Sequence, residues 1–159
     1  GKSTLIQAML GTITLTRGSR SIGPGVVVGV LGQDRRVLQG DHDLVRHVSD
    51  RCALSLSETR SLLAKFGLNA SHVSRSVRLL SPGERTRAEL AIFQAQGVNF
   101  LVLDEPTNHL DLRAIEQLES ALKGFGGTLL LTTHDRRLLE DVELTRTITM
   151  DGGMASEER

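Results

Sequence analysis

Two adjacent carboxylates follow a short apolar run in the second half of the chain. The run covers residues 100–103 (FLVL), and Asp104 and Glu105 come directly after it, before Pro106. Such a run, bounded by a polar turn, predicts a buried strand of a parallel sheet, and ligands of parallel sheets bind beyond the carboxyl ends of the strands. At that place one carboxylate can hold Mg²⁺ while its neighbour orients or deprotonates a water. The alternative is a strand end that carries two acids without a ligand.

A phosphate-binding pattern opens the chain. Gly1, Lys2, Ser3 and Thr4 match the last residues of the P-loop motif G-x-x-x-x-G-K-[ST]. Main-chain N–H groups at a helix start bind phosphate oxygens, helped by the helix dipole. In that arrangement Lys2 reaches the β- and γ-phosphates, the Ser3 hydroxyl ligates Mg²⁺, and Thr4 lies near the α-phosphate. The alternative for four residues alone is an ordinary flexible N-terminus.

The residues around this pattern set two further expectations. The apolar spacing of residues 5–10, with Gly11 after it, predicts a helix of about two to three turns. The first glycine of the motif would lie before Gly1, so we expect the chain to be part of a longer protein. Because this part does not complete the loop, we expect it to be inactive in isolation.

The composition is that of one α/β domain without a strong charge. The chain has 159 residues, of which 39% are hydrophobic, and its net charge is zero. It therefore has room for a core and no overall electrostatic attraction to nucleic acid or membranes. The single cysteine, Cys52, cannot form an internal disulfide, which favours a cytoplasmic protein. No apolar run approaches the roughly 18 residues of a membrane span, so we expect no direct membrane insertion.

The apolar pattern predicts an α/β core interrupted by helices. From residue 41 to 96 the spacing is helical, and Pro82 fits the first turn of the last of these helices. We therefore divide the chain into a core of residues 1–38 and 97–159 and a helical insert of residues 39–96, with a polar tail after 151. Strands are expected at 12–16, 26–31, 99–103, 128–131 and 146–150, and further helices at about 111–123 and 136–140.

Six segments together resemble an ABC-type ATPase domain. In the family's order they are the end of Walker A (1–4, GKST), the Q-loop glutamine (Gln33), the signature (80–84, LSPGE), Walker B with its catalytic glutamate (101–105, LVLDE), the D-loop (108–111, NHLD) and the histidine switch (133–135, THD). The resemblance implies a P-loop NTPase (RecA-like) parallel-sheet core with an inserted α-helical signature subdomain. Residues 105–111 (EPTNHLD) are similar to the ABC-F group of tandem ATPases, whereas transporter subunits more often read EPTSALD.

The resemblance also implies a mechanism in which two ATPase units pack head to tail with ATP and Mg²⁺ between them. In this pattern Ser3, Gln33 and Asp104 hold the metal. Glu105 polarises the attacking water, His134 holds the γ-phosphate, and Gln33 contacts both the metal and the water. Positioning and charge stabilisation are most of what phosphoryl transfer needs.

The remaining site residues follow from the same resemblance. The signature residues, which act in trans on the nucleotide of the other unit, are Ser81, Pro82, Gly83 and Glu84. The D-loop residues are Asn108 and Asp111. Pro82 replaces the first glycine of the family's signature and removes a main-chain N–H near a bound phosphate, so we expect slow hydrolysis in the site that faces it.

Other sites are disfavoured. A Ser3–His134–Asp135 hydrolase triad is unfavourable because His134 and Asp135 are neighbours and nothing resembles a nucleophile elbow. The spacing of His42 and His47 matches no zinc pattern, so we interpret these side chains, and likewise those of His72 and His109, as solvated.

Three functions stay open at this point. The first is an ABC-F protein that acts on the ribosome, as a translation factor or in antibiotic resistance, and it rests on residues 108–111. The second is the ATP-binding subunit of a membrane transporter, whose partner is a transmembrane subunit. The third, suggested by Pro82 and the incomplete P-loop, is an interaction module that does not hydrolyse ATP.

Overall fold

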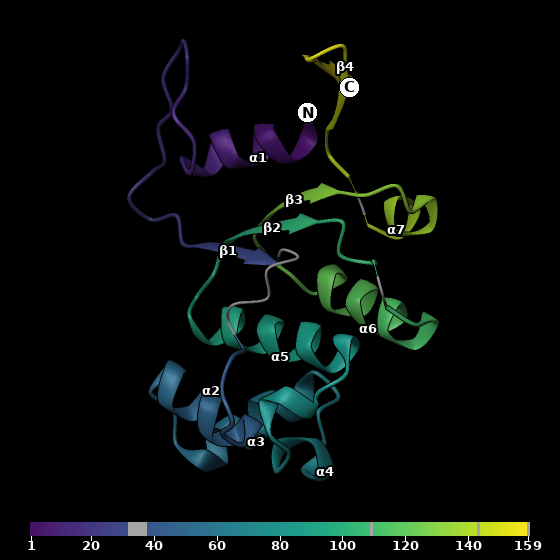
Figure 1. The fold of residues 1–159 in the computed structure, drawn as a ribbon. Helices are drawn as coiled ribbons and strands as arrows, with labels where there is room; N and C mark the ends of the chain where they lie inside the picture. Colours follow the sequence, from purple (N-terminus) through teal and green to yellow (C-terminus); the bar gives the residue numbers. More distant parts are fainter. Residues whose placement is uncertain (32–37, 109, 143, 159) are drawn as a thin grey trace.

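The computed structural model describes residues 1–31, 38–108, 110–142 and 144–158 (Figure 1). Gln33 and His109 therefore lie outside the described residues. In chain order, the elements are α1 (Lys2–Leu10), β1 (Val28–Leu31), α2 (Leu44–Cys52), α3 (Leu56–Lys65), α4 (Ala70–Val73), the 3-10 helix η1 (Val77–Leu79), α5 (Pro82–Ala95), β2 (Phe100–Asp104), α6 (Leu112–Lys123), β3 (Thr128–Thr132), α7 (Arg136–Asp141), β4 (Thr147–Asp151) and β5 (Met154–Glu158).

A parallel sheet lies between two layers of helices. Its strand order is β1-β2-β3, with helix α1 over one face and helices α5 and α6 over the other (Figure 1). Leu101, Val102 and Leu103 of β2 are all at most 1% exposed, because both faces of this central strand are covered. The α/β fold class is confirmed, and the register, which pairs Asp104 with Thr132, brings the carboxyl ends of β2 and β3 level.

Strand β1 is shorter and more exposed than expected. The sequence predicts a buried strand over residues 26–31, but the strand begins at Val28, and Val30 is 41% exposed on the face opposite α5. Gly29 faces α5, where a Cβ atom would lie 2.8 Å from Cγ1 of Val98 and 3.2 Å from Cγ of Phe93. The apolar run therefore alternates between the two faces of the sheet, and only one of them is tightly covered here.

Helix α1 ends as predicted, but the expected strand at residues 12–16 is wrong. Gly11 adopts φ 76° and its N–H donates to the carbonyl oxygen of Ala8. The following segment binds the helix end instead of pairing with a strand. The Thr12 hydroxyl donates to the carbonyl oxygen of Gln7 at 3.0 Å, and the Arg20 guanidinium donates to that of Met9 at 3.1 Å. These side chains satisfy carbonyls that a helix end leaves open.

The helical layer has a core of its own, and α5 joins it to the sheet. The predicted apolar face of Leu44, Val45 and Val48 is buried there, with Ala88, Ala91 and Ile92 of α5. Leu90 and Phe93, on another side of α5, pack against the sheet. Within the described residues, no helix is both long enough and apolar enough to cross a membrane.

The end of the chain forms a hairpin where the sequence suggests a polar tail. Strands β4 and β5 pair antiparallel around Gly152 and Gly153, whose φ angles are 53° and 83°. Two consecutive positive φ angles are what a tight two-residue hairpin turn requires. The expectation of a tail relied on polarity and overlooked this turn.

Candidate functional site

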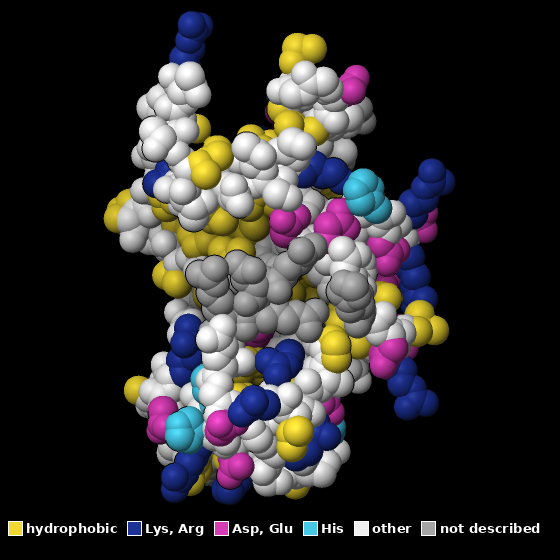
Figure 2. Space-filling model, in the orientation of Figure 1, with side chains coloured by type: hydrophobic (Ala, Val, Ile, Leu, Met, Phe, Trp, Pro, Cys, Tyr) yellow, Lys and Arg dark blue, Asp and Glu magenta, His cyan; other side chains and the backbone are white. Residues whose placement is uncertain are grey.

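Three charged or titratable side chains from distant parts of the chain meet beyond the carboxyl ends of the strands. The Lys2 ammonium lies 3.1 Å from Nε2 of His134 and 3.9 Å from Oε1 of Glu105. His134 Nε2 and Glu105 Oε1 are 3.4 Å apart. Figure 2 shows acidic, basic and histidine side chains gathered at the upper right of the visible face. The structure thus brings together three of the site residues that the sequence suggests, the two most distant of which are 132 positions apart in the sequence.

An unusual backbone conformation aims Glu105 into this cluster. Its φ angle is 49°, in the left-handed region, although it has a side chain. Such a conformation costs on the order of 1–3 kcal/mol and is concentrated at functional sites. Two hydrogen bonds hold it: Glu105 N–H donates to the carbonyl oxygen of Thr132 at 2.9 Å, and Asn108 N–H donates to that of Glu105 at 3.2 Å. Strand β2 therefore ends in a fixed turn that carries the carboxylate outward.

Asp104 is held by the neighbouring strand. Its Oδ1 accepts a hydrogen bond of 2.5 Å from the hydroxyl of Thr132, its register partner on β3. Magnesium in nucleotide sites is bound by one or two carboxylates together with phosphate oxygens, so Asp104 with the exposed Ser3 hydroxyl fits that requirement. No three His, Cys, Asp or Glu side chains of the described part gather to hold a metal without such help. Thr132 is a site residue that the sequence reasoning missed, and strand register is the signal that finds it.

Helix α1 supplies main-chain donors at the same end of the sheet. The nine-residue helix starts after Gly1, whose carbonyl accepts the N–H of Leu5 at 3.0 Å. A helix start leaves its first N–H groups without helical acceptors. These are the groups of the P-loop pattern, and the side chains of Ser3 and Thr4 beside them are exposed.

The signature residues begin α5, on the other side of the sheet from α1 (Figure 1). Ser81 is the N-cap: its hydroxyl accepts the N–H of Glu84 at 3.3 Å, and the Glu84 carboxylate accepts the N–H of Ser81 at 2.7 Å. Pro82 occupies the first helical turn, as expected. Gly83 is buried, and a Cβ atom there would lie 2.5 Å from Cβ of Ala114. A glycine at this position thus lets α5 and α6 approach closely.

The D-loop residues differ in their surroundings. Asp111 caps α6, since its Oδ1 accepts the N–H of Ala114 at 2.8 Å. Asn108 is exposed in the turn after Glu105. Because Ala114 fills the space that a Cβ atom on Gly83 would need, the start of α6 lies close against the start of the signature helix.

Arg85, which the sequence reasoning did not single out, joins three segments near the signature. Its guanidinium donates to the carbonyl oxygens of Leu80 at 3.3 Å, Leu38 at 3.1 Å and Arg78 at 3.2 Å. Leu38 is the first described residue after the segment that contains Gln33. No spacing rule reveals this contact, because it depends on how the segment at Leu38 and the segment around η1 both meet α5.

The interpretation of His72 as a solvated side chain is wrong. Its Nε2 lies 3.2 Å from Oε1 of Glu84, and its side chain is only 20% exposed. The adjacent Arg75 contacts the same carboxylate at 2.5 Å. Both donors come from the segment before η1, and the fold brings them to the signature helix.

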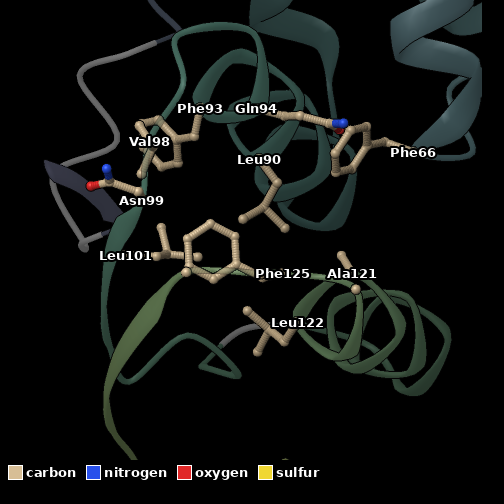
Figure 3. A pocket seen from close by; sticks show the side chains of 13 residues that line it. Phe66, Leu90, Phe93, Gln94, Val98, Asn99, Leu101, Ala121, Leu122 and Phe125 are labelled. Carbon is tan, nitrogen blue, oxygen red and sulfur yellow. The ribbon is translucent and has the colours of Figure 1, made fainter. Parts of the chain in front are cut away.

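An apolar cavity lies at the opposite end of the sheet. It has a volume of about 350 Å³ and is lined by aromatic rings, including Phe93 and Phe125, and by Val98 and Asn99 (Figure 3). The Asn99 amide is engaged by main-chain groups of Val27 and by the Gly25 carbonyl. Since the starts of strands β2 and β3 form this cavity, it is separate from the charged cluster at their ends.

Comparisons with known proteins agree with the geometry. Residues 1–108 match the family described as ABC transporter. The chain is 38% identical to YdiF of Bacillus subtilis over 143 residues, which cover 89% of this chain and 22% of that protein. It is 31% identical to the ribosome protection protein VmlR of the same species, over 97% of this chain and 28% of that protein. It is 34% identical to the erythromycin resistance ATP-binding protein MsrA of Staphylococcus epidermidis, over 89% of this chain and 28% of that protein. The chain thus spans about a quarter of the length of these relatives.

Solved structures share the fold. The dimeric ATP-binding cassette MJ0796, in a post-hydrolysis state with ADP and Pi, superposes with a TM-score of 0.77 at 20% identity. The match covers all of this chain and 80% of that one.

Proposed function

The chain belongs to the ABC transporter family, whose ATPase domain its residues 1–108 match, and we propose that within a longer protein it binds and hydrolyses ATP as part of an ABC-F protein acting on the ribosome. The observation that carries the proposal is the meeting of Lys2, Glu105 and His134 beyond the carboxyl ends of β2 and β3. We also propose that residues 39–96 serve as the signature-bearing insert of a core formed by residues 1–38 and 97–159, and that the protein works in the cytoplasm.

The charges at the cluster suit a triphosphate. Lys2 and the N–H groups at the start of α1 offer positive charge to the phosphates, and His134, whose side chain is 80% exposed, can contact the terminal phosphate. The Glu105 carboxylate, fixed by its turn, accepts a hydrogen bond from the attacking water. Magnesium, held by Asp104 and Ser3 with Gln33, would supply charge neutralisation on the phosphate oxygens.

The site needs a second ATPase unit. The P-loop residues and the signature belong to helices on opposite faces of the sheet (Figure 1). This arrangement supports the proposal that Ser81 and Gly83 act on a nucleotide held by another unit, with Pro82 and Glu84 shaping that helix start. The dimeric form of MJ0796 supports such a pairing. The second unit lies in the same chain or in a partner copy.

The names of the relatives support the ribosome as partner. VmlR is a ribosome protection protein and MsrA an erythromycin resistance protein, and both match most of this chain. Residues 105–111 (EPTNHLD) point the same way. The alternative is an ATP-binding subunit that joins a transmembrane transporter subunit, which is favoured by the fold shared with the cassette cbiO1, part of the ABC transporter complex cbiONQ.

The test is ATP turnover by the intact protein with and without ribosomes. We expect ribosomes to stimulate turnover, and Glu105→Gln to lower kcat by about two orders of magnitude or more, because an amide lacks the negative charge and basicity that activate the water. Glu116→Gln, which changes an acid of α6 that is 53% exposed, is the matched control and should leave kcat unchanged. Stimulation by a membrane partner and not by ribosomes would favour the transporter subunit. Unchanged turnover in Glu105→Gln would remove Glu105 from the chemistry.

A further inference from the structure

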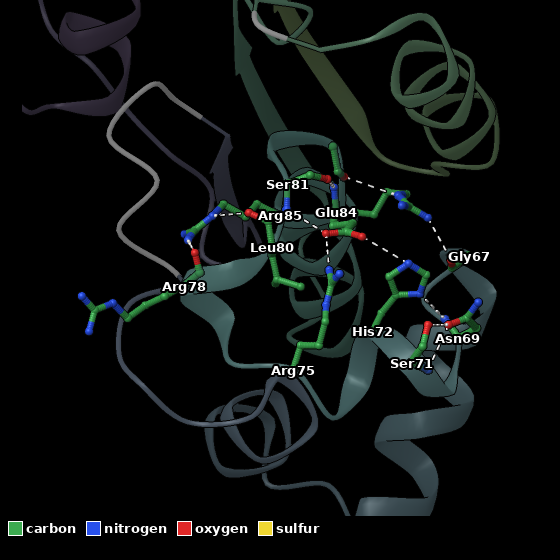
Figure 4. A network of polar contacts seen from close by, with 12 residues as sticks. Gly67, Asn69, Ser71, His72, Arg75, Arg78, Leu80, Ser81, Glu84 and Arg85 are labelled. Atoms are coloured by element: carbon green, nitrogen blue, oxygen red, sulfur yellow. Dashed lines mark hydrogen bonds and ion pairs between the residues drawn. The ribbon is translucent and has the colours of Figure 1, made fainter.

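The Glu84 carboxylate is the centre of a polar network beneath the signature (Figure 4). Its Oε2 accepts hydrogen bonds from Arg75 at 2.5 Å and from the Ser81 N–H at 2.7 Å, and its Oε1 lies 3.2 Å from Nε2 of His72. The side chain of Glu84 is only 13% exposed. One carboxylate thus connects the start of the signature helix to two side chains of the segment that precedes it.

The surroundings of His72 fix its role as a donor. Its Nδ1 accepts the N–H of Asn69 at 3.0 Å and therefore carries no proton. The ring proton is then on Nε2, which faces Glu84. In this network the carboxylate faces only donors, which come from His72, Arg75 and Ser81. Both oxygens of the side chain at position 84 must therefore act as acceptors.

A carboxylate meets that requirement and an amide does not. The NH₂ group of an amide at this position would face either the His72 N–H or the Arg75 guanidinium, donor against donor. The pKa of Glu84 is consistent with a stable anion: burial raises it, but the Ser81 N–H and Arg75 more than offset this and the pKa lies below its usual value. The side-chain donors His72 and Arg75 therefore favour an acid over an amide at position 84.

We infer that Arg75 and His72 are positioning residues, which hold Ser81 and Gly83 in place for the nucleotide of the facing unit by fixing the Glu84 carboxylate. This inference rests on the proposed function, since the signature acts only when a second unit binds ATP. Arg75 and His72 touch no reacting atoms in this account. They set the direction of the first turn of α5, where the Ser81 hydroxyl already caps the helix.

The experiment compares variants of the intact protein. Arg75→Gln removes the charged donor, and Arg75→Lys keeps the positive charge. Glu84→Gln replaces the central carboxylate of the network by an amide. The matched control is Arg78→Gln, because Arg78 lies three residues away in the sequence and its exposed side chain pairs with the exposed Asp41 at 2.7 Å. ATP kcat and KM, the affinity for a fluorescent ATP analogue and the Tm are measured for each.

We expect Arg75→Gln to lower kcat roughly tenfold to a hundredfold, because a small displacement of a positioning group has effects of that size. Analogue affinity should change little, since the P-loop that binds the nucleotide first is untouched. The Tm should fall only modestly, because His72 and the Ser81 N–H still pair with the Glu84 carboxylate. Arg75→Lys should recover part of kcat, and Arg78→Gln should match the wild type. The double variant Arg75→Gln/Glu84→Gln should be no slower than Glu84→Gln alone, because both changes break the same contact.

Several outcomes overturn the inference. They are an unchanged kcat in Arg75→Gln, a loss of kcat accompanied by equal losses of analogue affinity and Tm, and effects of the two changes that multiply in the double variant. The Glu105→Gln variant in the same assay separates this result from the proposed function. If Glu105→Gln abolishes turnover while Arg75→Gln does not change it, the inference fails and the proposed function stands; if Glu105→Gln turns over normally, the proposed function fails first.

Discussion

The two parts of the site differ in how completely their polar groups are satisfied. At the strand ends, Lys2, Glu105 and His134 approach one another at 3.1–3.9 Å, and the His134 side chain is 80% exposed. At the signature, Glu84 is 13% exposed and its contacts are 2.5–3.2 Å long. The first region can exchange its weak contacts for those of a ligand. The second is already fixed, which suits the proposed function, in which it presents N–H and hydroxyl groups to a partner in one geometry.

The largest effect that distinguishes the two regions should come from Lys2. In the proposed function Lys2 is the cation that faces the phosphates, so we expect Lys2→Ala in the intact protein to lower ATP affinity on the order of a hundredfold. Lys65→Ala, at the end of α3, is the matched control, because Lys65 is an exposed lysine far along the chain from the cluster. Equal ATP affinity in Lys2→Ala and Lys65→Ala would show that the strand-end cluster is not where phosphates bind.

The close approach of α5 and α6 should give the next largest effect. Gly83→Ala places a Cβ atom 2.5 Å from Cβ of Ala114, and we expect it to lower the free energy of unfolding by about 1–3 kcal/mol through overpacking. Ala114→Gly on the same background removes the clash and should restore part of the stability, measured by urea unfolding. If the second change restores nothing, the contact between Gly83 and Ala114 is not the reason for the glycine.

The smallest effect concerns pH. Because the pKa of Glu84 is lower in the folded protein than its ordinary value of about 4.5, the anion stabilises the fold above that pH, and the stabilisation is lost as pH falls through the lower folded value. The stability gap between wild type and Glu84→Gln should therefore be full at pH 6–7 and should close as the pH falls below about 4.5, as followed by urea midpoints. A gap that widens on acidification would contradict the depressed pKa.

The sequence predicts the strand-end cluster better than the signature network for a physical reason. Glu105 follows β2 and His134 follows β3, and parallel strands bring their carboxyl ends to one edge, so the meeting of these two residues follows from topology. The P-loop pattern at the start of α1 adds Lys2 to the same site. The contacts of Glu84 with His72 and Arg75 depend on how a short helix and a loop fold back onto α5. Periodicity carries no information about such a return, which explains why His72 is wrongly interpreted as solvated.

The errors in the fold predicted from the sequence have the same origin. Residues 12–16 alternate like a strand, yet Thr12 and Arg20 bind the end of α1 instead. The polar residues after 151 look like a tail, but Gly152 and Gly153 supply the turn that lets them pair. In each case a local hydrogen-bonding opportunity decides the structure, whereas the core elements are decided by burial.

The most direct measurement is a structure of the intact Glu105→Gln protein with ATP and Mg²⁺. We expect the terminal phosphate to contact Lys2 and His134, with the signature of a second unit on its other side. A nucleotide whose phosphates lie elsewhere, for example beside the apolar cavity at the starts of the strands, would contradict this expectation.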